Sequence, residues 1–306
     1  SVGLSDTSNL CGALEFSDNI SKSGTQPIIG TQIFFKFKDV MGLIPLLALN
    51  KTGYKRIIEL SSQSFLKNDN LSEPHCNFED LLINTDGLAV FSGSIHGLIG
   101  KLFNKGRFSE IDEIYKKTKF VYKDNFYIEI QRHGDQNEKT FENFNLIKSK
   151  ELQIPIIATH EVYYLDQSMH EAHDALTCIG LKTYINDNNR VKLTKEHYFK
   201  TNEEMINLFS DLPEALENNY NLPYRCDFRP LLSKPILPNI GSGQNINADD
   251  LLKKESDEGL KIKFLQVFNK NENEIDHDEE YRKYKQRLDH EIKIIQEMKY
   301  SSYFLI

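Results

Sequence analysis

The sequence predicts an α/β fold with a mainly parallel sheet or a closed barrel, covered by helices. Two observations predict this class. Over the first two-thirds of the chain, apolar runs typical of strands alternate with segments of helical periodicity. After about residue 200 the strand-like runs end and helical patterns alone continue. In such folds the chemistry lies at the carboxyl ends of the strands, so the residues that follow each strand are the first candidates for a site.

Six apolar runs are expected to form strands, and helical segments lie between most of them. The expected strands are residues 2–4, 28–37, 44–49, 88–91, 126–131 and 154–159. The expected helices are residues 9–22, 55–66, 109–118, 138–150 and 168–179. The first of these helices is expected to end before Gly24, because glycine is the commonest residue just past a helix.

The sequence pattern in the last third of the chain predicts a domain boundary followed by helices. Thr201 and Glu204 form a capping box that begins one short helix, and Pro213 lies in the first turn of the next. The stretch that follows contains several prolines and glycines and is expected to be a linker. The predicted division is a first domain at 1–230, a linker at 231–248 and a second domain at 249–306, with helices at 249–268 and 279–298.

Composition excludes several classes of protein. The 306 residues carry a net charge of −8, whereas nucleic-acid-binding domains usually have a basic face. We therefore expect weak, salt-dependent DNA binding at most. No apolar run reaches the roughly 20 residues that span a bilayer, so no membrane contact is expected. The four cysteines form no C-x-x-C pair, which is consistent with a reducing cytoplasm.

Polar side chains gather at the expected strand ends. Asp6 follows the first strand, Glu129 and His133 lie on and just after the fifth, and His160 and Glu161 follow the sixth. Carboxylates and imidazoles that converge at one edge of a barrel can hold Zn²⁺ or Mn²⁺. The alternative is a polar rim held together by hydrogen bonds. Spacing alone leaves both open.

Seven segments, taken in order and with their spacing, resemble the alpha subunit family of bacterial replicative DNA polymerase III. They are LSDTSNLCG at 4–12, QPIIG at 26–30, LALNKTGY at 47–54, FYIEIQRHG at 126–134, IIATHEVYY at 156–164, FSDLPEA at 209–215 and SSYFLI at 301–306. The resemblance implies that residues 1–230 are a polymerase-and-histidinol-phosphatase (PHP) domain, a distorted β/α barrel. It also implies that residues 249–306 begin the polymerase palm.

The resemblance further implies that the chain is a fragment cut at both ends. It begins without methionine, lacks the first PHP strand and ends in the apolar run 303–306. The catalytic aspartates of the family lie downstream of that run, so no catalytic residue is expected here. The full-length enzyme would use Mg²⁺ and act in the cytoplasm. Its proofreading exonuclease subunit would dock on the PHP domain, whereas DNA, the sliding clamp and the clamp loader would bind elsewhere.

The departures from the family concern metal binding. Metal-loaded PHP domains carry His, Glu, Cys and His where this chain has Thr7, Gln32, Ser94 and Tyr163. Thr, Gln and Tyr are poor ligands for Zn²⁺, which thiolates, imidazoles and carboxylates bind.

The pocket is therefore expected to be vestigial, with Asp6 and Glu161 as its remaining ligands, Glu129, His133 and His160 on its rim, and no bound metal.

Three functions compete. The leading hypothesis is the N-terminal portion of a replicative DNA polymerase, in which this part has a structural and partner-docking role. The alternative is a stand-alone metal-dependent PHP phosphoesterase. The missing ligands and the palm-like residues after 245 argue against it. The third hypothesis is a non-enzymatic scaffold.

Overall fold

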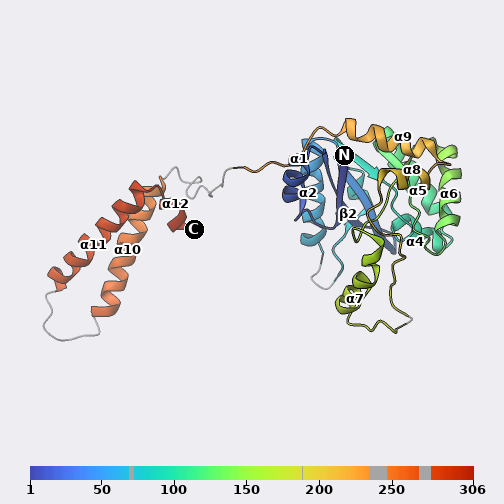
Figure 1. Cartoon of the computed structure of the whole chain (residues 1–306). Coiled ribbons are helices and arrows are strands. Elements are labelled where there is room, and N and C mark those ends of the chain that lie inside the picture. Colours follow the sequence, from blue (N-terminus) through green and yellow to red (C-terminus); the bar gives the residue numbers. More distant parts are fainter. Residues whose placement is uncertain (69–71, 188, 234–246, 269–276) are drawn as a thin grey trace. The chain divides into compact units, whose positions relative to one another are not determined.

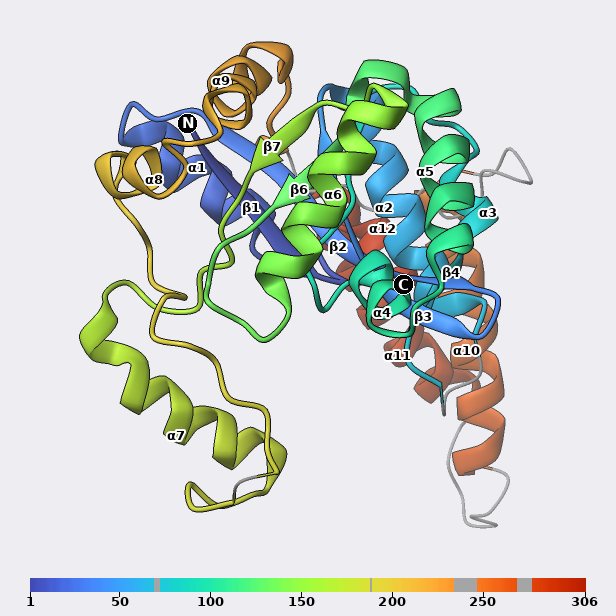
Figure 2. The same ribbon diagram turned by 90° about the vertical axis from the view of Figure 1, so that its right-hand side faces the viewer.

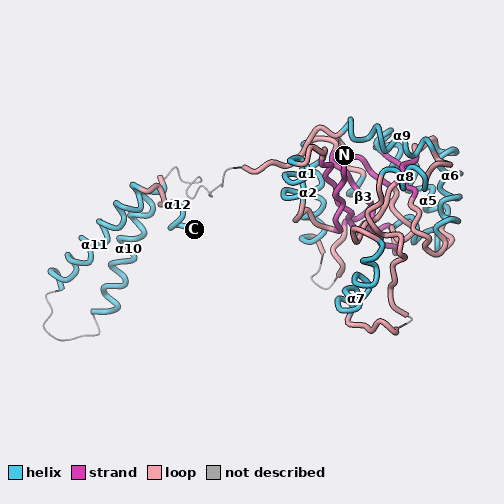
Figure 3. The backbone as a smooth tube through the Cα atoms, in the orientation of Figure 1, coloured by secondary structure: helices cyan, strands magenta, loops and turns pink. Residues whose placement is uncertain are grey.

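The computed structural model describes residues 1–68, 72–187, 189–233, 247–268 and 277–306. The contacts within the chain divide it into two units, Ser1–Leu232 and Ser233–Ile306 (Figure 1). Most of the expected linker at 231–248, namely residues 234–246, lies outside the described part. Figure 3 shows that the described strands gather in the first unit, where helices surround them.

The first unit is built on a mixed sheet that curls into a half-barrel (Figure 2). Its strand order is β1-β2-β3-β5-β6-β7, and β4 pairs with β2 beside this path. The strands are β1 (Val2–Thr7), β2 (Pro27–Phe37), β3 (Val40–Ala48), β4 (Cys76–Asn77), β5 (Leu88–Phe91), β6 (Phe126–Ile130) and β7 (Ile156–Ala158). These strands confirm the α/β class and add the short β4, which the apolar pattern did not predict.

The sheet departs from the expected parallel arrangement at β3. The β1–β2, β2–β4, β5–β6 and β6–β7 pairs are parallel, but β3 is antiparallel to both β2 and β5. Only Lys38 and Asp39 separate β2 from β3, and Lys38 has a φ of 54° in this turn. A two-residue connection can form a hairpin, whereas a parallel neighbour requires a crossover of a dozen or more residues.

Helices cover the sheet and bury both of its faces. They are α1 (Ala13–Lys22), α2 (Lys51–Leu66), α3 (Phe78–Leu81), α4 (Leu98–Asn104), α5 (Phe108–Tyr122), α6 (Glu138–Leu152), α7 (His170–Leu181), α8 (Asn202–Leu208) and α9 (Pro213–Asn221). Three single 3₁₀ turns lie at Lys123–Asn125, Gln167–Met169 and Leu222–Arg225. The predicted capping box is present, since the Thr201 hydroxyl accepts from the Glu204 N–H and the Glu204 carboxylate accepts from the Thr201 N–H.

The larger core lies between the sheet and α2, α4 and α5, where Phe35, Leu46 and Ile57 are fully buried. The smaller core lies on the other face and includes Leu47, Tyr127 and Leu222. All four residues of β5 are buried. A strand buried on both faces explains why this segment is a continuous apolar run without alternation.

One part of the first unit projects from the rest. Residues 165–193, here called the α7 segment, leave the sheet after β7 and return before α8 (Figure 2). A bridge between Tyr164 and Tyr198 joins the residues that flank this segment. The Tyr164 hydroxyl also donates to the Thr194 carbonyl at 2.8 Å. On the segment itself, Leu176 and Ile179 are 63% and 75% exposed.

The second unit contains α10 (Ala248–Phe268), α11 (His277–Glu297) and α12 (Ser301–Leu305) in its described part. Lys285 on α11 pairs with Asp257 on α10 at 2.6 Å, and Ile292 is buried between the helices. Tyr284 on α11 is 48% exposed, and its ring contacts that of Phe264 on α10 edge to face. In the described residues we find no helix with the length and apolar character needed to cross a bilayer.

We expect Gly53→Ala to lower the free energy of unfolding by about 2–4 kcal/mol. Gly53 is buried in the first turn of α2, and a Cβ there would overlap the carbonyl oxygen of Gly87. The matched control is Gly180→Ala on α7, where an added Cβ meets nothing within 4 Å. In urea denaturation, the free energy of unfolding of this control should lie within about 1 kcal/mol of the wild-type value. Equal effects of the two substitutions would contradict the packing of α2 against the Gly87 turn.

Candidate functional site

A buried carboxylate holds the loop that follows β6. Glu138, the first residue of α6, accepts hydrogen bonds from the backbone N–H groups of His133 (2.8 and 2.9 Å) and Gly134 (2.7 Å). The His133 Nδ1 lies 3.3 Å from the Glu138 Oε1. Burial acts to raise the pKa of Glu138, but the hydrogen bonds from His133 and Gly134 outweigh it and the pKa is lowered. Glu138 is therefore a carboxylate at neutral pH, and His133 is fixed against it.

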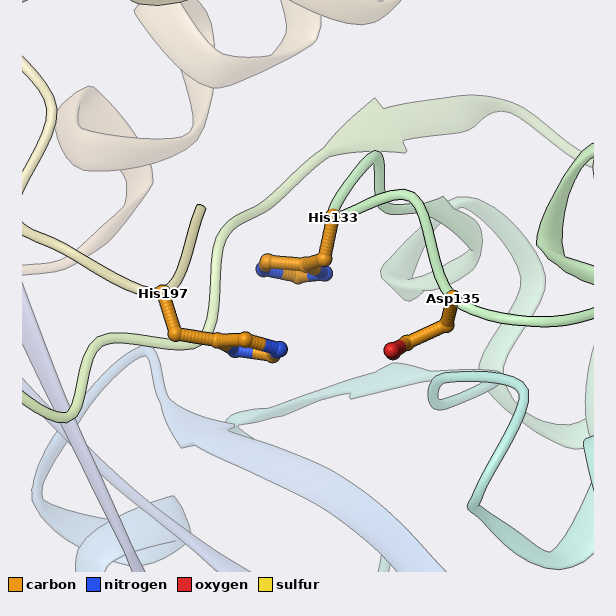
Figure 4. Close-up of side chains that lie close together, drawn as sticks. All are labelled: His133, Asp135 and His197. Atoms are coloured by element: carbon orange, nitrogen blue, oxygen red, sulfur yellow. The ribbon is translucent and has the colours of Figure 1, made fainter. Parts of the chain in front are cut away.

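Three imidazoles meet at His133, and we call His133, His160 and His197 the histidine cluster. The His133 ring stacks on His160 at a centroid distance of 4.3 Å and on His197 at 4.1 Å. Figure 4 shows the rings of His133 and His197 face to face, and their planes differ by 3°. Burial lowers the pKa of both His160 and His197 to about 4. Both rings are thus neutral at pH 7.

Backbone hydrogen bonds orient these rings. The Glu161 N–H donates to His133 Nε2 at 3.1 Å, so His133 presents its Nδ1–H to Glu138. His197 Nδ1 lies 3.3 Å from the Glu161 carbonyl, and His160 Nε2 lies 2.7 Å from the Glu196 carbonyl. The remaining nitrogens, His197 Nε2 and His160 Nδ1, are buried without a hydrogen-bond partner within the described part of the chain.

The residue types of a metal site are present here. His133, Asp135 and His197 each offer a ligand atom, and these atoms lie within 4.8 Å of one another. In Figure 4 the Asp135 carboxylate points toward the two rings. The same carboxylate lies 3.2 Å from His96 Nε2, and this hydrogen bond lowers the pKa of Asp135. Two imidazoles and a carboxylate are ligands that Zn²⁺ and Mn²⁺ accept.

The arrangement of these residues does not fit a single ion. A metal binds an imidazole in the plane of the ring, about 2.0–2.1 Å from the nitrogen. The planes of His133 and His197 are parallel and stacked, so no point lies in both planes. In addition, His133 Nε2 already accepts the Glu161 N–H, and Nδ1 faces Glu138. A metal would require at least one ring to turn, and we derive no chemical step through one.

The structure places the residues predicted from the sequence in different surroundings. His133 and His160 are in the histidine cluster, and Glu161 is hydrogen-bonded to it through its backbone. Burial raises the pKa of the Glu161 carboxyl, while the nearby histidines and a hydrogen bond with Gln32 oppose this. Asp6 is half-buried at the end of β1. Within the described structure it does not lie in a cluster of potential metal ligands. The role of Asp6 and Glu161 as remnants of a metal site stays a prediction.

Sequence reasoning missed Asp135 and His197. Asp135 follows His133 in the same loop, so a wider search after β6 would have included it. His197 is 36 residues beyond Glu161 and follows no strand, so no local pattern marks it. It reaches the cluster because the α7 segment returns to the sheet. Tyr163, one of the substituted ligand positions, contacts the His197 ring edge to face at 5.5 Å.

Glu129, expected on the rim, is a second buried carboxyl close to the cluster. It is 5% exposed, and its Oε1 accepts hydrogen bonds from Gln131 at 2.9 Å and from the Thr159 hydroxyl. Its Oε2 has no hydrogen-bond partner in the described structure, and Glu129 lines a cavity of about 10 Å³. Burial raises the pKa of Glu129 to about 7.

Comparison with known proteins shows a family for the N-terminal part of the first unit. Residues 1–133 match the PHP domain family. This part of the chain belongs to the PHP domain family. The DNA polymerase III alpha subunits of Rickettsia bellii, Rickettsia conorii and Caulobacter vibrioides are 36%, 37% and 35% identical to it and align with its whole length. These similarities confirm both the PHP-type fold and the resemblance predicted from the seven ordered segments.

The chain spans about a quarter of the length of these relatives, since it covers 26%, 26% and 27% of them. It also aligns with a crystal structure described as a metal-dependent phosphoesterase of Bifidobacterium adolescentis, at 10% identity and a TM-score of 0.35. That alignment covers 52% of this chain and 75% of the other, and the likeness is too low to support an argument about function.

We expect Glu129→Gln to change how stability depends on pH. The pKa of Glu129 is raised to about 7 from 4.5, so its stabilising effect is fully present below 4.5 and is lost as the pH rises through 7. Glutamine does not titrate, so the variant does not lose this stability as the pH rises. Relative to the wild type, the variant should therefore gain roughly 1–3 kcal/mol between about pH 5 and about pH 8.

Urea denaturation at the two pH values measures this change. His160 and His197 act in the opposite direction, because their lowered pKa makes the chain lose stability as the pH falls from 6.5 toward 4. Both histidines are present in the wild type and in the variant, so their effect on stability cancels when the two proteins are compared. Glu214→Gln on the exposed surface of α9 is the control for the substitution itself. A pH-independent difference between Glu129→Gln and wild type would show that Glu129 does not titrate in this range.

Proposed function

We propose that the chain is the N-terminal portion of the catalytic alpha subunit of a bacterial replicative DNA polymerase. The observation that carries this proposal is the 35–37% identity to DNA polymerase III alpha subunits along the whole chain, which extends beyond the PHP domain into the helical second unit. The reaction of the full-length protein would be template-directed DNA synthesis with Mg²⁺, in the cytoplasm. DNA, the sliding clamp and the clamp loader would bind its other regions.

Within that protein, the proposed role of this part is structural and partner-docking. A net charge of −8 disfavours a main role in DNA binding, and the stacked imidazoles do not fit a single metal ion. The family's catalytic aspartates have no counterpart in the sequence. A phosphoesterase is the second candidate, because His133, Asp135 and His197 are of the right residue types. It would require the cluster to rearrange around a metal.

We expect the purified chain to show no DNA synthesis. Primer extension with Mg²⁺ and all four nucleotides should remain at the level of a blank, because the residues that would bind the two metal ions of the reaction are absent. The full-length protein is the positive control. Extension by the chain alone would place catalysis in residues 1–306. Hydrolysis of a phosphate monoester that depends on added Mn²⁺ or Zn²⁺ would instead favour the phosphoesterase.

We also propose that the proofreading exonuclease subunit docks on the α7 segment. Exposed apolar side chains gather there, including Leu176 (63%), Ile179 (75%) and Tyr184 (84%). Isolated apolar side chains are normal on a protein surface, whereas several of them along one projecting segment are typical of an interaction site.

Ile179→Asp in the full-length protein should weaken binding of the exonuclease subunit about tenfold or more, because a buried charge would replace an apolar contact. Phe120→Asp on α5 is the matched control, since Phe120 is also highly exposed (83%) but lies outside the α7 segment. Titration calorimetry or surface binding would compare the two. Unchanged affinity for Ile179→Asp, or an equal loss for Phe120→Asp, would exclude docking on the α7 segment.

A further inference from the structure

Three segments that are distant in sequence meet at the histidine cluster. The first is the loop after β6, which contains His133 and is held by Glu138. The second is the loop after β7, which contains His160 and Glu161. The third is the stretch between the α7 segment and α8, which contains His197. None of the three belongs to a regular strand or helix, so their mutual position depends on contacts between side chains and backbone.

His133 and its neighbours join the three segments by direct hydrogen bonds. The Glu161 N–H donates to His133 Nε2, which connects the second segment to the first. The Thr194 hydroxyl donates to the His133 carbonyl at 2.7 Å, which connects the third segment to the first. The Tyr163 N–H donates to the His197 carbonyl at 3.0 Å, and His197 Nδ1 lies beside the Glu161 carbonyl. A metal ion at this place would connect the same segments.

Ring stacking completes the contact. His133 and His197 are each 1% exposed, so the stacked faces are removed from water. The nitrogen His197 Nε2 has no hydrogen-bond partner in the described structure, and its ring contributes by packing and by the single contact at Nδ1. A metal site would use one of the ring nitrogens of His197 as a ligand. Stacking needs only a flat ring at this position. A substitution that keeps the ring but removes its nitrogens therefore distinguishes a stacked cluster from a metal site.

We propose that the histidine cluster holds the loops at this edge of the PHP domain together without a metal ion, and that it thereby closes the base of the α7 segment. His133 is the central residue, positioned by Glu138 and bonded to Glu161, and His197 acts mainly as a stacked ring. The inference concerns the PHP fold of this chain and does not depend on the proposed polymerase function.

The test compares two substitutions of His197 in the 306-residue chain. His197→Phe keeps a flat ring and removes both nitrogens, whereas His197→Ala removes the ring. If stacking holds the loops, His197→Phe should melt within about 2 °C of the wild type and His197→Ala at least about 5 °C lower. Excess EDTA or stoichiometric Zn²⁺ should leave the melting temperature of the wild type unchanged. His290→Ala, at an exposed position of α11, is the control.

Hydrogen exchange gives the second measurement. Peptides from residues 159–200 should exchange faster in His197→Ala than in His197→Phe, because opening of the cluster releases the base of the α7 segment. His133→Leu should increase this exchange most, and the comparison of the two His197 variants stands if His133→Leu does not fold. Stoichiometric Zn²⁺ binding that raises the wild-type melting temperature by several degrees, and that His197→Phe abolishes, would overturn the proposal. Equal destabilisation by phenylalanine and alanine would overturn it as well.

Discussion

The site depends on the loop between β6 and α6. The carboxylate of Glu138 holds this loop by accepting three hydrogen bonds from its backbone. Glu138 binds the N–H groups of His133 and Gly134 at the point where the chain turns from β6 into α6. It is also the first residue of that helix, where a negative charge is favoured by the helix dipole. Because these bonds fix His133, they also fix the surface on which His160 and His197 stack.

The topology of the sheet explains why these loops meet. β6 and β7 are parallel neighbours, with Ile130 beside Ala158, so their carboxyl ends lie at the same edge. The loops that carry His133 and His160 therefore begin side by side. The antiparallel β3 reverses the chain direction in the middle of the sheet and leaves this edge unaffected. The result is a half-barrel whose polar residues gather at the ends of its parallel strands, as α/β folds generally arrange them.

The electrostatics of the site reflect burial more than catalysis. Burial raises the pKa of Glu129 and lowers the pKa of His160 and His197, so each change favours the neutral form. Perturbed groups of this kind often mark active sites. Here their hydrogen-bond partners are mostly backbone carbonyls and neighbouring side chains. This pattern agrees with polar residues whose task in this domain is structural.

The sequence alone determined the α/β class, most strands and helices, the capping box of Thr201 and the PHP resemblance, because each depends on local pattern or on ordered motifs. It also placed Glu129, His133 and His160 near one edge. Only the tertiary structure decided the direction of β3, the short β4 at Cys76–Asn77 and the arrival of His197 beside His133. Strand pairing and the return of the α7 segment are contacts between residues far apart in the chain. Local periodicity carries no information about such contacts, and so the stacking of His133 on His197 became visible only in the folded chain.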